Sequence, residues 1–203
     1  MSPRLILARH GDTFAPGEKV VFVGARSDPP LTARGREQAR AGAAELSRRG
    51  LAPDRVLCGP LRRTREAAEI FAETLGAPAP EPDARLTEID HGAWEGKSAE
   101  EIRALWGEAA FLAYDRDGAW PQAVGFSPPR AMLLARVDAL LDEAAAGRGA
   151  PLYVTSNGVL RLFGARAGAR PEAAKMRTGA LSLLSLDADG ARIEFWNVSP
   201  ERG

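Results

Sequence analysis

Cysteine and histidine are scarce in this sequence of 203 residues, which contains a single cysteine, Cys58, and two histidines, His10 and His91. A lone thiol excludes an intramolecular disulfide bond, and so few histidines exclude a cysteine–histidine zinc cluster. Histidines and carboxylates do not group at metal-ligand spacing either, so we expect no metal site. The cysteine content fits a protein of a reducing compartment.

The sequence also lacks a net charge and long apolar runs. Its 27 basic and 27 acidic residues balance, so no overall field favours nucleic acid or an anionic membrane surface, and any anion site must be local. No stretch approaches the roughly 20 apolar residues of a membrane span, and the apolar run after Met1 is too short for a signal peptide. We expect a cytoplasmic protein that binds neither nucleic acid nor membranes.

The order of the predicted elements indicates an α/β fold. Apolar runs predict strands at about residues 4–9, 54–58 and 151–155, and helical patterns are found at about 33–49, 60–75 and 130–146. Thr32 is the predicted N-cap of the first helix, and Ser98 with Glu101 predicts a capping box that begins a short helix. The stretch "ALSLLSLDADGARIEFWNV" predicts a hairpin. Together these predict a three-layer sandwich, with a mostly parallel central sheet and helices on both faces, in a single domain over residues 1–203.

Two irregular segments interrupt this pattern. Residues 14–31 form a loop longer than most, and residues 107–128 combine glycine and proline breaks with aromatic residues. We expect these two segments to select the substrate. Trp106, Phe111 and Trp120 are expected to be exposed, where they could serve a lid or the contact of a homodimer equally well.

Five short stretches carry a resemblance that covers nearly the whole chain. They are "RHGDT" after the first strand, then "DPPLTARGREQA", "CGPLRRTREAAEI", "LTEIDHGAWEG" and "VTSNGVLR". In order and spacing they resemble the histidine phosphatase superfamily, the phosphoglycerate mutase-like proteins. The resemblance implies a phosphatase or phosphotransferase that acts on a small phosphorylated metabolite.

The residues in these stretches suit the transfer of a phosphoryl group. A phosphate ester is dianionic, so the reaction needs cations around the phosphoryl oxygens and a nucleophile held in line. A neutral imidazole can attack phosphorus, which favours His10 as the nucleophile and a phosphohistidine intermediate. By resemblance, Arg9 and Arg63 form the phosphate clamp, and Glu88 is the general acid that protonates the leaving alkoxide. This chemistry needs no cofactor.

Asn157 aligns with the position of the family's second catalytic histidine. An asparagine amide can donate a hydrogen bond to a phosphoryl oxygen, but it carries no charge. We expect Asn157 to face the phosphate, with Lys175 or Arg177 supplying the missing cation.

Other positions depart from the family pattern or have more modest expected roles. Pro16, Gly59 and Ala67 each replace a phosphate ligand or a supporting group. His91 is expected in the pocket wall rather than in catalysis, and Arg26 is the candidate for binding a second anionic group of the substrate. The remaining charged residues of the motifs are expected to hold their loop, as for Asp90 and Glu95, or to be solvated, as for Arg62 and Arg65.

These residues leave three functions to weigh. The intact nucleophile, clamp and acid favour a phosphatase for a small phosphorylated metabolite. The substitutions favour a catalytically weak or inactive phosphate-binding or regulatory protein instead. A phosphoglycerate mutase-type phosphotransferase ranks lower, because mutases usually have extra segments over the site. In each case the expected partner is a small phosphorylated substrate or inorganic phosphate.

Overall fold

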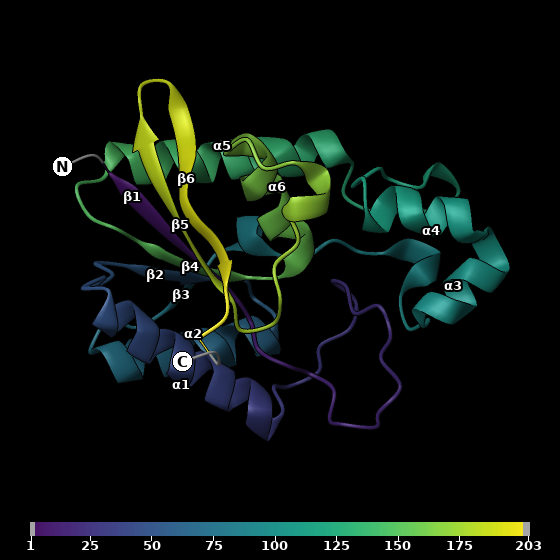
Figure 1. The fold of residues 1–203 in the computed structure, drawn as a ribbon, viewed down its shortest axis with the longest axis horizontal. Coiled ribbons are helices and arrows are strands. Elements are labelled where there is room, and N and C mark those ends of the chain that lie inside the picture. Colours follow the sequence, from purple (N-terminus) through teal and green to yellow (C-terminus); the bar gives the residue numbers. More distant parts are fainter. Residues whose placement is uncertain (1–2, 201–203) are drawn as a thin grey trace.

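The computed structural model describes residues 3–200, which fold around a six-stranded sheet (Figure 1). Four strands run parallel, in the spatial order β3 (Glu81–Pro82), β2 (Val56–Cys58), β4 (Leu152–Thr155) and β1 (Arg4–Arg9). The antiparallel hairpin of β5 (Leu181–Asp187) and β6 (Gly190–Val198) extends the sheet beside β1. The predicted α/β fold, its mostly parallel sheet and its last hairpin are thereby confirmed.

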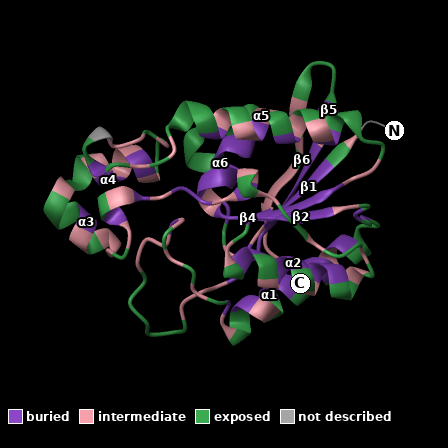
Figure 2. Ribbon diagram, turned by 180° about the vertical axis from the view of Figure 1, so that it is seen from behind, coloured by how far each residue is buried: buried purple, intermediate pink, exposed green. Residues whose placement is uncertain are grey.

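Helices cover both faces of the sheet. α1 (Ala33–Arg48) and α2 (Arg62–Leu75) lie on one face, and α5 (Arg130–Ala146) and α6 (Asn157–Arg166) on the other (Figure 1). The side chains of β1 alternate between two core clusters, because successive strand residues point to opposite faces. Leu5 and Leu7 join the cluster with α5 and α6, whereas Ile6 and Ala8 join the cluster with α1 and α2. The central strands β2 and β4 are accordingly buried along their whole length, whereas the edge strands β3 and β6 are not (Figure 2).

The predicted helix caps form as the sequence indicates. Thr32 Oγ1 accepts a hydrogen bond of 3.0 Å from the backbone N–H of Gly35 at the start of α1. Ser98 and Glu101 make the reciprocal hydrogen bonds of a capping box at the start of α3 (Ala99–Trp106). None of the helices in the described part of the chain is long and apolar enough to cross a membrane.

α3 and α4 (Glu108–Asp115) lie beyond the ends of the strands, apart from the helices that cover the sheet (Figure 1). They enclose an aromatic core of their own, in which Phe111 is 5% exposed and contacts Trp94. Trp106 packs against the same cluster, and Trp120 packs against the main core. The expectation that these aromatic side chains are exposed is therefore wrong, because the segment folds back on itself.

The carboxyl ends of β1 and β4 meet at one edge of the sheet. The two strands are parallel neighbours, with Arg9 paired to Thr155 in the register. His10 follows β1, its backbone N–H donates to the carbonyl of Thr155 over 3.1 Å, and Asn157 begins α6 two residues further on. The topology thus brings the chemistry-bearing residues of two distant motifs side by side.

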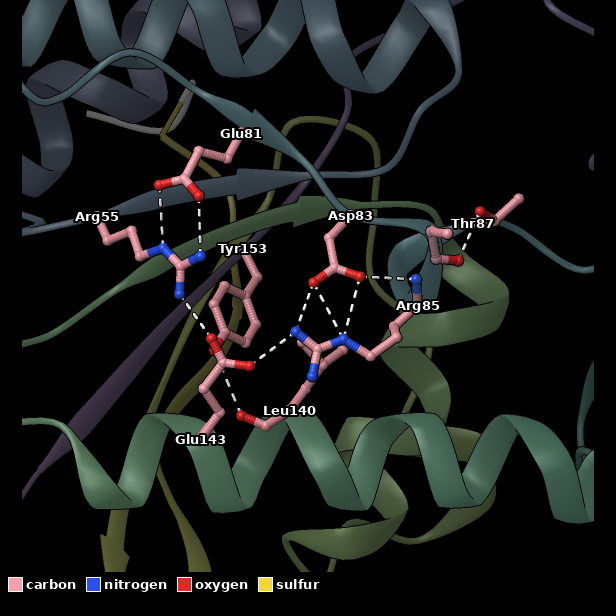
Figure 3. A network of polar contacts seen from close by, with 9 residues as sticks. Arg55, Glu81, Asp83, Arg85, Thr87, Leu140, Glu143 and Tyr153 are labelled. Carbon is pink, nitrogen blue, oxygen red and sulfur yellow. Dashed lines mark hydrogen bonds and ion pairs between the residues drawn. The ribbon is translucent and has the colours of Figure 1, made fainter.

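A network of ion pairs holds the segment that leads from β3 to Glu88 (Figure 3). Glu143 of α5 accepts from Arg55 Nη1 at 2.5 Å and from Arg85 Nη2 at 2.7 Å. Arg55 also pairs with Glu81 of β3, and Arg85 pairs with Asp83. The network therefore joins β2, β3 and the turn at 84–86 to the helix that packs beneath them.

Candidate active site

A cavity of about 710 Å³ opens at the carboxyl edge of the parallel strands. The residues predicted to carry the chemistry all line it, namely Arg9, His10, Arg63, Glu88 and Asn157. They come from β1, the loop that follows it, α2, the segment after β3, and α6. The structure thus brings together the five residues that the sequence motifs place at strand ends and helix starts.

His10 is held in one tautomer by the backbone. Its Nδ1 lies 2.8 Å from the carbonyl oxygen of Gly11, and because a carbonyl can only accept, Nδ1 carries the proton. Nε2 is then the unprotonated nitrogen with a lone pair for attack. Burial lowers the pKa of His10 well below its ordinary value, and the positive charges of Arg9 and Arg63 lower it further. The imidazole is therefore neutral at neutral pH.

Gly11 is required by the close approach of its loop to α1. A Cβ atom at this position would overlap the backbone carbonyl of Gly35, which cannot move without displacing the helix. The glycine of the "RHGDT" motif thus allows the chain after the histidine to pack directly against the backbone of α1. This packing fixes the backbone that in turn orients the His10 ring.

The two arginines of the predicted clamp are anchored by backbone carbonyls. Arg9 Nη1 donates to the carbonyl of Met176 at 2.6 Å. Arg63 is 1% exposed and donates to the carbonyls of Ser27 and Gly24, at 2.8 and 3.1 Å. Burial lowers the pKa of both guanidinium groups, yet an arginine stays charged in a protein. Arg9 Nε is buried and has no hydrogen-bond partner within residues 3–200, so it can donate to a bound anion.

Glu88 closes the site opposite the start of α6. Its Oε2 accepts from the backbone N–H of Gly158 at 3.1 Å, and its Oε1 accepts from its neighbour Ile89 at 2.9 Å. A Cβ atom at position 158 would overlap Oε1 and would lie 2.6 Å from Cδ1 of Ile89. Gly158 therefore leaves the space in which the carboxylate lies, at the positive end of a helix.

Asn157 is tied to the phosphate clamp through one peptide group. Its Oδ1 accepts from the backbone N–H of Met176 at 2.9 Å, and the carbonyl of Met176 accepts from Arg9. With Oδ1 engaged in this way, Nδ2 is the amide group that can donate to a phosphoryl oxygen. Asn157 lines the cavity, and its contact with phosphate stays a prediction.

The two residues expected to supply a replacement cation, Lys175 and Arg177, both have other partners in the structure. Lys175 lines the cavity, but its Nζ pairs with Asp115 Oδ1 of α4 at 2.6 Å. Arg177 is exposed, donates to the backbone carbonyl of Asn197, and is not part of the lining. The prediction for Arg177 is corrected accordingly, because the chain turns it toward β6.

Arg26 is also outside the cavity lining, so its predicted contact with a second anionic group is corrected. Its Nε lies 3.0 Å from Asp90 Oδ1 and 3.5 Å from Glu95 Oε2, and it donates to the carbonyl of Gly92. Asp90 accepts from the backbone of Gly92 as well. Arg26 thus serves the loop that Asp90 and Glu95 were expected to hold.

The remaining sequence expectations are met in part. Arg62 is exposed and pairs with Glu66 at 2.7 Å, and Arg65 is exposed. Gly59 and Ala67 do not line the cavity, whereas Pro16 does. A Cβ atom at Gly59 would lie 2.8 Å from the carbonyl of Leu86, so the glycine serves close packing. Of the three positions expected to replace a phosphate ligand or a supporting group, only Pro16 is placed where it could have contacted the phosphate directly.

His91 lies in the cavity wall, as expected. It is 5% exposed, its Nε2 is 3.0 Å from the hydroxyl of Tyr114, and its ring packs edge-on against Phe22 and Phe126. Burial lowers its pKa. An aromatic environment of this kind fits a wall residue.

The lining residues that the sequence analysis missed include Arg161 and Asp12. Arg161 is 7% exposed and donates through Nη1 to the carbonyl of Tyr114 at 3.0 Å. It stands four residues after Asn157 on α6, so the helical period already placed it on the same face. Asp12, within "RHGDT", accepts from Thr178 Oγ1 at 2.5 Å and pairs with Arg34 at 3.3 Å. Only the folded chain brings those partners to it.

The arrangement can perform nucleophilic chemistry on an anion. A neutral imidazole nitrogen, the guanidinium groups of half-buried Arg9 and buried Arg63, and a carboxylate line the same cavity. The guanidinium groups can balance the charge of a phosphoryl group, and the carboxylate can exchange a proton with a leaving oxygen. Among the residues that the structure describes, no three histidine, cysteine or acidic side chains gather as a metal site would require.

Comparison with known proteins places this site in a family. The family model described as "Histidine phosphatase superfamily (branch 1)" matches residues 5–199. A 2,3-bisphosphoglycerate-dependent phosphoglycerate mutase from Bifidobacterium longum (strain DJO10A) is 36% identical over 124 residues, which are 60% of this chain and 49% of the mutase. The match thus spans about half the length of that curated relative.

Solved structures match over nearly the whole chain. A mycobacterial glucosyl-3-phosphoglycerate phosphatase superposes with a TM-score of 0.80 at 25% identity, covering 98% of this chain and 100% of that one. The same phosphatase has been solved with inorganic phosphate, and that structure superposes with a TM-score of 0.78. An alpha-ribazole phosphatase from Shigella flexneri, 24% identical over 97% of this chain and 96% of its own, shows the shared fold with a TM-score of 0.73.

Proposed function

Since the chain belongs to the histidine phosphatase superfamily (branch 1), we propose that it is a phosphatase that hydrolyses a small phosphorylated metabolite through a phosphohistidine at His10. One observation carries the proposal. The Nδ1–H of His10 is bound to the carbonyl of Gly11, which leaves Nε2 as the nucleophilic nitrogen in a cavity that Arg9 and Arg63 also line. This is the arrangement that attack on a phosphoryl group requires.

The first step transfers the phosphoryl group to the enzyme. Nε2 of His10 forms a bond to phosphorus while the bond from phosphorus to the ester oxygen breaks. Protonated Glu88 gives its proton to the leaving oxygen, which departs as an alcohol. Arg9 Nε and the Asn157 amide donate to the equatorial oxygens, where negative charge gathers in the transition state.

The second step releases the phosphate. A water molecule attacks phosphorus, the bond from phosphorus to Nε2 breaks, and Glu88 takes the proton of the water. Inorganic phosphate leaves, and His10 and Glu88 return to their starting states. The solved phosphate complex of the mycobacterial phosphatase, which has the same fold, supports inorganic phosphate as a ligand of this cavity.

A second candidate function is a phosphate-binding or regulatory protein with little turnover. The observation that favours it is the neutral amide of Asn157 together with the engagement of Lys175 by Asp115. Both leave the site with less positive charge than a second histidine would bring. A mutase ranks lower, because the chain matches about half of its mutase relatives' length.

The decisive experiment compares the two histidines. The purified protein is incubated with an aryl phosphate, and both turnover and acid-labile, alkali-stable phosphate on the protein are measured. His10→Ala is expected to abolish both, whereas His91→Phe, which keeps a ring in the aromatic wall, is expected to retain covalent labelling. A parent protein that binds phosphate but shows neither turnover nor label would support the second candidate instead.

A further inference from the structure

The cavity is lined by two kinds of surface. Around His10 the lining consists of charged and amide groups, whereas the loop before α1 and the first residue of α3 contribute apolar side chains. Together these side chains form the apolar wall, which includes Phe14, Pro16, Val20, Val21, Phe22 and Ala99. The loop, in purple, and α3 both lie beyond the strand ends in Figure 1. A substrate whose phosphoryl group reaches His10 would therefore place its leaving group against them.

The apolar wall is held in position rather than left free. Phe22 packs edge-on against Trp94, with ring centroids 5.6 Å apart, and its backbone exchanges hydrogen bonds with Lys97 and Gly96. A turn at residues 15–18 is closed by the N–H of Glu18 on the carbonyl of Ala15. Val20, between these anchors, is 66% exposed, which is unusual for so large an apolar side chain.

Apart from Arg161, whose Nη1 donates to the carbonyl of Tyr114 and whose buried Nη2 has no hydrogen-bond partner within residues 3–200, the lining cations outside the clamp are paired. Lys175 is paired with Asp115 at 2.6 Å, and Arg34 with Asp12 at 3.3 Å. The loop that forms the apolar wall adds an acidic side chain, Glu18, to the lining. A carboxylate or second phosphate on the leaving group would have to compete with these ion pairs and would approach Glu18.

We infer that the leaving group of the preferred substrate is an uncharged, largely apolar alcohol, such as an alkyl or aryl group, rather than a phosphorylated or carboxylated one. The inference rests on the phosphatase function proposed above. A cavity of about 710 Å³ is in the size range of sites that enclose small organic ligands. Apolar contact there selects among phosphate esters, because His10 and the clamp recognise only the phosphoryl group that all of them share.

The test uses alkyl esters whose leaving alcohols have similar intrinsic reactivity. Methyl, ethyl and butyl phosphate are compared with glycerol 3-phosphate and 3-phosphoglycerate by phosphate release. Each methylene that packs on the wall is expected to raise kcat/KM by up to about fourfold. A series that is flat with chain length, or in which 3-phosphoglycerate exceeds butyl phosphate, would overturn the inference.

A variant pair locates the effect. The double variant Val20→Thr/Val21→Thr keeps the β-branched shape and removes apolar surface, so the ratio of kcat/KM for butyl over methyl phosphate is expected to fall about threefold or more. Leu105→Thr is the matched control, since Leu105 is 63% exposed and lies outside the cavity lining. If this ratio is the same in the parent, the double variant and the control, the apolar wall does not contact the leaving group and the inference is wrong.

Binding of non-hydrolysable analogues separates this inference from the function on which it rests. Methyl and butyl phosphonate are titrated into the protein by calorimetry. If no ester is turned over but butyl phosphonate binds several-fold more tightly than methyl phosphonate, the phosphatase proposal fails and the apolar subsite stands. If esters are turned over and the two phosphonates bind equally, the subsite fails and the phosphatase stands.

Discussion

Asn157 gives the sharpest test of the site, because its two amide atoms have separable roles. Oδ1 accepts from the buried backbone N–H of Met176, and Nδ2 is the atom available to phosphate. Asn157→Ala removes both functions. Asn157→Asp keeps an oxygen acceptor for Met176 and replaces the donor with a negative charge. The two variants therefore separate a structural from a phosphate-binding role.

The expected magnitudes follow from these contacts. In Asn157→Ala the N–H of Met176, a residue 2% exposed, loses its acceptor, which costs about 1–3 kcal/mol of folding free energy. Losing one neutral donor to phosphate costs about 1 kcal/mol more in binding, or about fivefold. In Asn157→Asp the fold keeps its hydrogen bond, but a charge about 4 Å from the phosphoryl group, at an effective dielectric constant of about 20, opposes binding by about 4 kcal/mol, or around a thousandfold.

The assays are thermal unfolding, phosphate titration by calorimetry and turnover of an aryl phosphate. Asn157→Ala is expected to lower the melting temperature by about 2–4 °C per kcal/mol and to weaken phosphate binding modestly. Asn157→Asp should melt near the parent temperature and lose phosphate binding. Asn157→His, which adds a charge-assisted donor, should preserve or raise turnover. If the Ala variant binds phosphate and turns over as the parent does, Asn157 has no part in the site and the reasoning is refuted.

Three further outcomes are expected. Gly158→Ala displaces the Glu88 carboxylate, so kcat should fall at least tenfold, which corresponds to a barrier higher by about 1.4 kcal/mol, while phosphate affinity is kept. Gly147→Ala, remote from the cavity, is the control. Equal kcat values in the two variants would contradict the role of Glu88. The pKa values of His10 and His91 are lowered in the folded protein, so below about pH 6.5 the unfolded chain binds more protons than the folded chain. The free energy of unfolding should therefore decrease as the pH is lowered, which urea midpoints at pH 7.5 and 5.5 measure. Unchanged midpoints would argue against neutral buried imidazoles. Glu143→Gln weakens two partly exposed ion pairs (Figure 3) and should lower the melting temperature by a few degrees. The loss should be smaller in high salt, because salt screens the ion pairs of the parent protein. A loss that does not depend on salt would mean that packing is the cause.

The sequence by itself determined the fold class and the edge at which the site lies. The patterns that predict the strands, the Thr32 cap and the Ser98 capping box each involve only a few neighbouring residues. They can therefore be recognised in the sequence without knowledge of the tertiary structure. Because the strands that end before His10 and Asn157 are parallel, their order along the chain already predicted that the two residues meet.

Only the tertiary structure decided which partners the charged groups find. Lys175 pairs with Asp115, 60 residues away, and Arg26 pairs with Asp90, 64 residues away. The burial of Phe111 likewise depends on how α3 and α4 fold back on Trp94. Ion pairs and aromatic contacts of this kind depend on the paths of long loops, which no local pattern specifies, because contacts at large sequence separation are fixed only when the whole core packs.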